Sequence, residues 1–136
     1  MITVTFLIDP WLKPVGNSNE WELVDHFTVR IEEDGKPTEI VTVPRGFTTD
    51  LASVPRLPGA YLLFANRARR SAILHDYLYS QHRPRKWADA VFNAAMKNEV
   101  SFLPRFFMWL GVRIGGGAYY EDVTSQPPLN PKGNAP

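Results

Sequence analysis

The fold of the N-terminal third is decided by the stretch FTVRIEEDGKPTEIVTV, residues 27–43. Apolar residues alternate with polar ones over residues 27–31, which is the period of a half-buried β-strand. Asp34-Gly35 is a strong turn signal, and a strand pattern returns over residues 38–43. The stretch therefore predicts a β-hairpin or a meander.

Two further segments extend this β-rich zone, which covers residues 1 to about 50. Every second residue of 2–8 is apolar, which predicts a strand with one fully apolar face. The strand pattern that leads into the hairpin begins upstream, so we predict a second strand over residues 21–32. Residues 10–19 hold two prolines and a glycine, and we predict an irregular loop there.

The C-terminal half is predicted to be helical. Residues 67–81 carry apolar side chains at helical spacing. Pro84 suits the first turn of a second helix, whose apolar stripe covers residues 87–96. A third and very apolar helix is predicted from residue 104 to about residue 114, ended by the three glycines 115–117.

These elements predict a single α+β domain over residues 1–122. It would comprise a small N-terminal antiparallel sheet of three or more strands, packed with a C-terminal layer of three helices. A chain of 136 residues suits one domain of this kind. Residues 123–136 are rich in proline, and we predict an extended or disordered tail there.

Composition excludes several classes of protein. The chain has no cysteine, which rules out disulfides, thiolate metal sites and cysteine nucleophiles. Fifteen Lys and Arg residues against fourteen Asp and Glu residues give a net charge of +1, so we expect no nucleic-acid partner. No apolar run approaches the roughly 18 residues of a transmembrane segment. The N-terminus lacks the basic start of a signal peptide, and we predict none.

The sharpest chemical signal is the stretch LHDYLY, residues 74–79, followed by Asp89. His75 and Tyr79 are four residues apart and share one face of a helix, and Asp76 can border the same side. Because the second helix should run back antiparallel, Asp89 could accept from one nitrogen of His75 and from the Tyr79 hydroxyl. The other imidazole nitrogen would then be free as a base, and Asp76 would be available for a hard cation. The alternative is a buried network that only tethers two helices.

A second signal is the stretch GFTTDLASVP, residues 46–55. A glycine beside hydroxyl residues and an Asp predicts a tight loop that could supply oxygens to a metal, and we expect Asp50 to reach Asp76. The alternative is that Asp50 or Ser53 caps the helical turn that follows. A zinc site is conceivable, but the chain lacks a second well-spaced His beside His75, so calcium is favoured over zinc.

Two surface features leave alternatives open. Six basic residues flank the helical motif and could steer an anionic substrate, or they could form an ordinary solvated face. They are Arg67, Arg69, Arg70, Arg83, Arg85 and Lys86. The apolar helix at residues 102–114 could contact a membrane. We expect it to be core instead, because its four consecutive apolar residues 106–109 leave no polar face there.

These motifs resemble a known family. GFTTDLASVP, then His75-Asp76-x-x-Tyr79, then Arg85 and Ala88-Asp89 are similar to the phage and prophage family called domain of unknown function 1353, over residues 43–113. The resemblance implies a tailed-phage or prophage origin and a place in the virion or in lysis. We therefore expect synthesis in the cytoplasm of a bacterial host, possible association with the virion, and partners among other virion proteins or the bacterial envelope.

A second resemblance supplies a mechanism. His-Asp-x-x-Tyr with an Asp on the antiparallel helix is similar to the active site of phospholipases of the A-two class, in their secreted and parvovirus-capsid forms. It implies that His75 activates a water, that Asp76 binds calcium, and that Tyr79 and Asp89 hold His75. The Tyr-x-Gly-x-Gly calcium loop of those enzymes is missing upstream, where residues 46–50 could substitute.

Two functions follow as hypotheses. The first is a metal-assisted hydrolase that acts on phospholipid ester or cell wall during phage entry or lysis, with His75 as general base. The second is a non-enzymatic virion protein of the tail or baseplate, in which the same network is structural. For the hydrolase we assign catalytic residues His75, Asp89 and Tyr79, metal ligands Asp76 and Asp50, and substrate-binding residues Arg85, Ser53 and Thr49.

Overall fold

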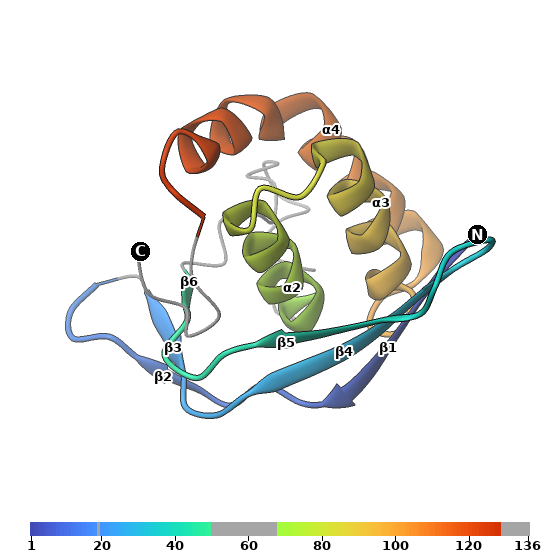
Figure 1. The fold of residues 1–136 in the computed structure, drawn as a ribbon. Coiled ribbons are helices and arrows are strands. Elements are labelled where there is room, and N and C mark those ends of the chain that lie inside the picture. The colour runs from blue at the N-terminus through green and yellow to red at the C-terminus, as the bar shows by residue number, and fades with distance from the viewer. Residues whose placement is uncertain (19, 50–67, 129–136) are drawn as a thin grey trace.

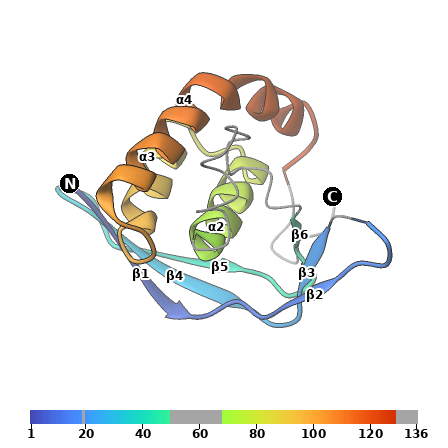
Figure 2. The same cartoon turned by 180° about the vertical axis from the view of Figure 1, so that it is seen from behind.

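The computed structural model describes residues 1–18, 20–49 and 68–128, and it shows the predicted α+β architecture (Figure 1). Two three-stranded antiparallel sheets are formed by the N-terminal part of the described chain, and the helices follow. The helices lie on one side of the longer sheet, in both views of the ribbon (Figures 1 and 2). Strands and helices are thus segregated along the chain, as the sequence predicts.

The longer sheet contains β1 (Ile2–Ile8), β4 (Phe27–Glu33) and β5 (Glu39–Val43), in the order β1-β4-β5. It confirms the predicted hairpin, whose turn places Gly35 at a φ of 78°. The apolar face of β4 is completely buried under the helices. In β1 the register shifts after Phe6, and Ile8 at the strand end is exposed, so its predicted apolar face is buried only in part.

The shorter sheet contains β2 (Leu12–Pro14), β3 (Trp21–Leu23) and β6 (Thr48–Thr49), in the order β2-β3-β6. Two predictions are wrong here. The predicted strand 21–32 is two strands in different sheets, because the chain turns at residues 24–26 to change partner. The predicted irregular loop 10–19 contains β2, whose Pro14 is tolerated because β2 is an edge strand.

Two helices pack antiparallel over the sheet: α2 (Arg69–Ser80) and α3 (Arg85–Met96), with Pro84 at the start of α3 as predicted. The turn between them is a Schellman motif, in which the amide of His82 donates to the carbonyl of Tyr79 and the amide of Arg83 donates to the carbonyl of Leu78. His82 takes the left-handed φ of 57° that this motif requires. The turn thereby fixes the direction in which α3 returns along α2.

The third helix, α4 (Phe102–Thr124), is longer than predicted, because the three glycines do not end it. A Cβ on Gly116 would lie 3.5 Å from the Tyr79 hydroxyl, and one on Gly117 would lie 3.5 Å from Nη1 of Arg85. These two glycines thus lie in ordinary van der Waals range of side chains of α2 and α3, and α4 stays helical through them despite their low helix propensity. The first half of α4 runs beside α3 and the second half crosses the end of α2 (Figures 1 and 2).

The expectation that the apolar helix is core holds for one face only. Met108 and Val112 are buried against α3, while Phe106 and Phe107 are exposed. A helix on the outside of a two-layer domain can bury only one stripe, whatever the composition of the other. At its far end α4 continues two residues past the predicted domain boundary, and residues 129–136 of the predicted tail lie outside the described residues.

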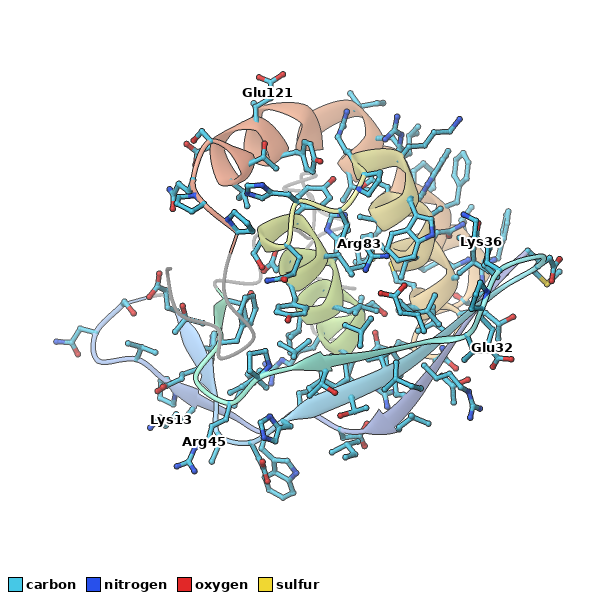
Figure 3. All side chains as sticks on the ribbon, in the orientation of Figure 1. Lys13, Glu32, Lys36, Arg45, Arg83 and Glu121 are labelled. Atoms are coloured by element: carbon cyan, nitrogen blue, oxygen red, sulfur yellow. The ribbon has the colours of Figure 1, made fainter. Side chains whose placement is uncertain are left out.

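Two charged side chains fix α2 at its ends. The carboxylate of Glu99 accepts from the backbone amides of Arg70 and Ser71, which satisfies donors that the first turn of a helix leaves open. At the other end Arg83 makes a bidentate pair with Glu39 of β5, at 2.5 and 3.0 Å. Arg83 lies between the helices and the sheet, whereas the other labelled side chains lie at the periphery (Figure 3). Its hydrogen bonds hold the pKa of Glu39 below the usual value.

Candidate functional site

The candidate site is built around the carboxylate of Asp89, which is completely buried. Oδ1 of Asp89 lies 2.7 Å from Nε2 of His75 and accepts a hydrogen bond of 2.5 Å from the Tyr79 hydroxyl. Oδ2 accepts a bond of 2.8 Å from Nη1 of Arg113. The predicted helix pairing thus brings His75, Tyr79 and Asp89 within hydrogen-bonding reach. It also adds a cation from α4.

The imidazole of His75 is enclosed by aromatic rings. It stacks on Phe92, with ring centroids 4.7 Å apart, and its centroid lies 4.1 Å from that of Tyr79. Only 1% of His75 is exposed. Its second nitrogen, Nδ1, is buried and has no hydrogen-bond partner within the described part of the chain. The ring is therefore fixed in orientation while one polar atom stays unsatisfied.

The surroundings assign the protonation states of this cluster. Burial alone would raise the pKa of Asp89, but hydrogen bonds from His75, Tyr79 and Arg113 outweigh it and lower the pKa, so Asp89 is ionised. Burial lowers the pKa of His75, and Asp89 opposes this only in part, so the imidazole is neutral at pH 7. Because an ionised carboxylate can only accept, the hydrogen-bond pattern assigns the proton to Nε2 and a lone pair to Nδ1.

Tyr79 acts as a fixed donor in this arrangement. Burial, together with the nearby charge of Asp89, raises the pKa of Tyr79, so its hydroxyl keeps its proton throughout the neutral range. The tyrosine consequently holds one oxygen of Asp89 in place and does not exchange a proton with it. This agrees with the positioning role that the sequence pattern implies for Tyr79.

Arg85, which the sequence analysis assigns to substrate binding, reaches the cluster from α3. Its Nη2 donates to the backbone carbonyls of Val112 and Arg113, at 2.9 and 2.7 Å, and its Nε lies 3.9 Å from Oδ2 of Asp89. These contacts make Arg85 a link between α3 and α4. Its positive charge also contributes to the low pKa of His75.

Asp76 and Thr49 meet beside this cluster. The Thr49 hydroxyl donates to Oδ2 of Asp76, and both side chains are buried. Two predicted site residues from distant parts of the chain are therefore in contact. Asp50 and Ser53, the other two residues predicted in that loop, lie outside the described residues. Within the described ranges no group of three His, Asp or Glu side chains is gathered that could hold a metal ion.

Sequence reasoning missed two members of the cluster, Arg113 and Phe92. Phe92 was assigned only to the apolar stripe, and nothing in its spacing marks it as a stacking partner. Arg113 did carry a signal, because no other residue in the range 106–120 is charged. A lone cation in so apolar a helix needs a buried carboxylate or an exit to solvent, and the carboxylate of Asp89 can accept a further hydrogen bond besides those predicted from His75 and Tyr79.

Fold and site together define an α+β protein in which a buried aspartate joins three helices through a histidine, a tyrosine and an arginine. The chain belongs to the DUF1353 family, described as proteins of unknown function, whose model matches residues 21–112. The matched range includes His75, Asp76, Tyr79 and Asp89 and stops just before Arg113. Comparisons with curated proteins and with solved structures find no match.

Proposed function

We propose that this protein is a hydrolase of cell-envelope material in which His75 is the general base. The observation that carries the proposal is Nδ1 of His75, a buried acceptor with no hydrogen-bond partner among the described residues. Leaving such an atom unsatisfied costs about 1–3 kcal/mol, and a catalytic role is one of the explanations for an unsatisfied buried group in a native protein. A network that serves only to tether helices gains nothing from it.

The arrangement suits the activation of a water by Nδ1. A water hydrogen-bonded to Nδ1 would give up its proton to that nitrogen as its oxygen attacks an ester or amide carbonyl. Asp89, bonded to Nε2 at 2.7 Å, would stabilise the imidazolium that forms, and it is itself held by Tyr79 and Arg113. The proton on Nδ1 would then pass to the leaving group, which restores neutral His75. The proposal requires that water and substrate reach Nδ1.

The proposed context is a bacteriophage or prophage, with phospholipid ester or cell wall as the substrate during entry or lysis. The support is the resemblance of the motif at residues 74–79 and of Asp89 to the catalytic helices of phospholipases of the A-two class. In that pattern one imidazole nitrogen faces an Asp, as Nε2 of His75 does, and the other activates a water, which is the role proposed here for Nδ1.

A divalent cation, calcium in preference to zinc, is a separate part of the proposal. Asp76 would be its carboxylate ligand and Thr49 lies against that carboxylate, but two such groups do not complete a cation site. Asp50 is the further ligand that the sequence predicts. Isothermal titration of wild type with CaCl₂ should show one site that Asp76→Asn removes. Equal heats of CaCl₂ binding for wild type and for Asp76→Asn would contradict a cation site at Asp76.

One observation favours the alternative, a non-enzymatic virion protein of the tail or baseplate. His75 is enclosed by Phe92 and Tyr79, and both oxygens of Asp89 are already paired. A cluster that is closed in solution could serve only to tie α2, α3 and α4 together. In that case Nδ1 would be inaccessible to small reagents as well as to substrate.

The test combines access with activity. Diethyl pyrocarbonate modifies accessible neutral imidazoles, so peptide mapping should find His75 modified if the base can be reached, with the exposed His26 as the internal positive control. Hydrolysis is then measured on phosphatidylglycerol vesicles, a short-chain soluble phospholipid and purified peptidoglycan, with and without CaCl₂. His75→Gln should abolish the activity and His26→Gln should keep it. An unmodified His75, together with no hydrolysis by wild type, would decide for the structural alternative.

A further inference from the structure

An exposed apolar surface lies along α4. The side chains that form it are between 41% and 77% exposed, and we call them the α4 face: Phe102, Leu103, Phe106, Phe107 and Ile114. Contiguous exposed apolar side chains on a domain of this size mark an interaction site. The function proposed above does not use them.

The rings of the α4 face pack on one another, and Phe106 also contacts Trp109, which packs against the buried cluster. Phe106 lies 6.3 Å from Phe102 and 5.7 Å from Phe107, measured between ring centroids. The inward stripe of the same helix is formed by Met108 and Val112, which α3 buries. The helix is thus apolar on two sides, and only one side is explained by the fold.

The charges that border the exposed rings are positive, whereas the two acidic residues of α4, Glu121 and Asp122, lie near its C-terminal end. Residues 100–120 contain two arginines and no acidic residue. The guanidinium of Arg105 lies over the Phe102 ring, 5.4 Å from the ring centroid, so a cation borders the exposed rings directly. Lys97 is exposed just before the helix begins. Aromatic and leucine side chains bordered by cations suit an anionic lipid surface, where rings enter the acyl boundary and cations meet phosphates.

We propose that the α4 face docks the protein onto an anionic lipid surface. Within the described residues no helix is long and apolar enough to cross a membrane, so α4 would lie in the plane of the interface. Arg113 of the same helix contacts Asp89, so docking would bring the His75 cluster to the membrane. This last step rests on the proposed hydrolase and selects phospholipid over cell wall as its substrate, whereas lipid binding itself does not depend on catalysis.

The experiment measures sedimentation of the whole chain with sucrose-loaded vesicles. Phosphatidylglycerol–phosphatidylcholine vesicles should bind the protein at least tenfold more tightly than pure phosphatidylcholine, and 0.5 M NaCl should weaken that binding. The double substitution Phe106→Asp, Phe107→Asp should reduce binding at least tenfold. Trp11→Asp, which removes an exposed aromatic residue between β1 and β2, outside α4, should leave vesicle binding unchanged.

Two controls keep the outcomes distinct. The pair Phe102→Ser, Leu103→Ser should weaken binding independently of the first pair, and circular dichroism melts of both variants check that they fold. His75→Gln should bind vesicles as wild type does, so loss of hydrolysis and loss of docking are read separately. Absence of binding to anionic vesicles, or binding that both pairs leave intact, overturns the proposal. A stable dimer in light scattering that the Phe106→Asp, Phe107→Asp variant dissolves also overturns it, in favour of a second copy of this chain.

Discussion

Nη1 of Arg113 lies 2.8 Å from Oδ2 of Asp89, and this one contact ties α4 to the centre of the cluster that α2 and α3 form. Asp89 is completely buried, whereas Arg113 is partly exposed. The arginine therefore neutralises a buried carboxylate without being fully desolvated itself. Because a guanidinium stays charged at all accessible pH values, Asp89 is held ionised and can keep accepting from His75.

Replacing this arginine should weaken the fold. Arg113→Gln removes the charged donor to Oδ2 of Asp89, and we expect the free energy of unfolding to fall by about 1–3 kcal/mol. The melting temperature should decrease by about 2–8 °C for each kcal/mol lost. Arg105→Gln is the matched control on the same helix, because Arg105 has no ion pair among the described residues, and its effect should stay within about 0.5 kcal/mol. Equal melting shifts for the two variants would contradict the role of Arg113.

The site was only partly predictable from the sequence, because some of its contacting residues are far apart along the chain. His75 and Tyr79 share a helix face at a spacing that fixes their relation, and a short turn determines where Asp89 returns. Arg113 is 24 positions beyond Asp89, and its contact depends on how α4 packs against α3, which no local spacing determines. Spacing rules carry no information over such a distance, so a tertiary contact of this kind needs the structure.

Stability should decrease on acidification in a way that depends on His75. Burial lowers the pKa of His75 in the folded protein, so below the usual value of about 6.5 the unfolded chain takes up the proton first. The stabilisation is complete above that pH and is lost as the pH falls towards the folded pKa. The pKa of Asp89 is also lowered, so its contribution is lost in the same direction at lower pH.

The measurement is the melting temperature of wild type and of His75→Gln between pH 8 and pH 5. The difference in melting temperature between wild type and His75→Gln should become smaller as the pH falls. Only wild type loses the stabilising contribution of a buried neutral imidazole. Comparing the pair cancels every pH-dependent contribution that the two proteins share. A difference that stays constant over this range would show that His75 does not titrate with a lowered pKa.

Substitution by alanine should change the stability of the protein in opposite directions at Gly115 and at Gly35. A Cβ at Gly115 would meet nothing within 4 Å, and the residue is helical, so Gly115→Ala should stabilise the protein by about 0.5–1 kcal/mol. Gly35 has a φ of 78° in the hairpin turn, so Gly35→Ala should destabilise by about 1–2 kcal/mol. Denaturant titrations of both variants check this. A loss of stability in Gly115→Ala would mean that α4 is not helical at the glycines.

The fold itself was largely predictable, because its main elements carry strong periodicity. The alternation in β4 and the stripe of α3 each match one buried face, and the structure confirms both. The failures are β2 and β6, of three and two residues, which are too short to show a period. The glycines 115–117 are the other failure, since their propensity predicts an end to the helix, whereas α4 continues through them beside Arg85 and Tyr79.

The most decisive test of His75 as the general base is the Asp89→Asn variant. The asparagine side chain has one accepting oxygen and one donating NH₂ group, whereas the ionised carboxylate has two accepting oxygens. Arg113 can only donate, so the amide oxygen should turn towards it and the amide nitrogen towards Nε2 of His75. Nε2 would then have to accept, which moves the imidazole proton to Nδ1 and removes the lone pair that the proposed mechanism needs. We expect hydrolysis to fall by about 10²–10⁴-fold.

The tautomer can be read directly from ¹⁵N chemical shifts of the imidazole. Wild type should show His75 protonated at Nε2, and Asp89→Asn should show it protonated at Nδ1, while Asp122→Asn, which removes an exposed carboxylate from α4, should change nothing. A shifted tautomer with full hydrolytic activity would exclude Nδ1 as the base. A shifted tautomer with lost activity and a folded protein would separate the chemical role of His75 from its packing role, which substitution of the histidine itself does not do.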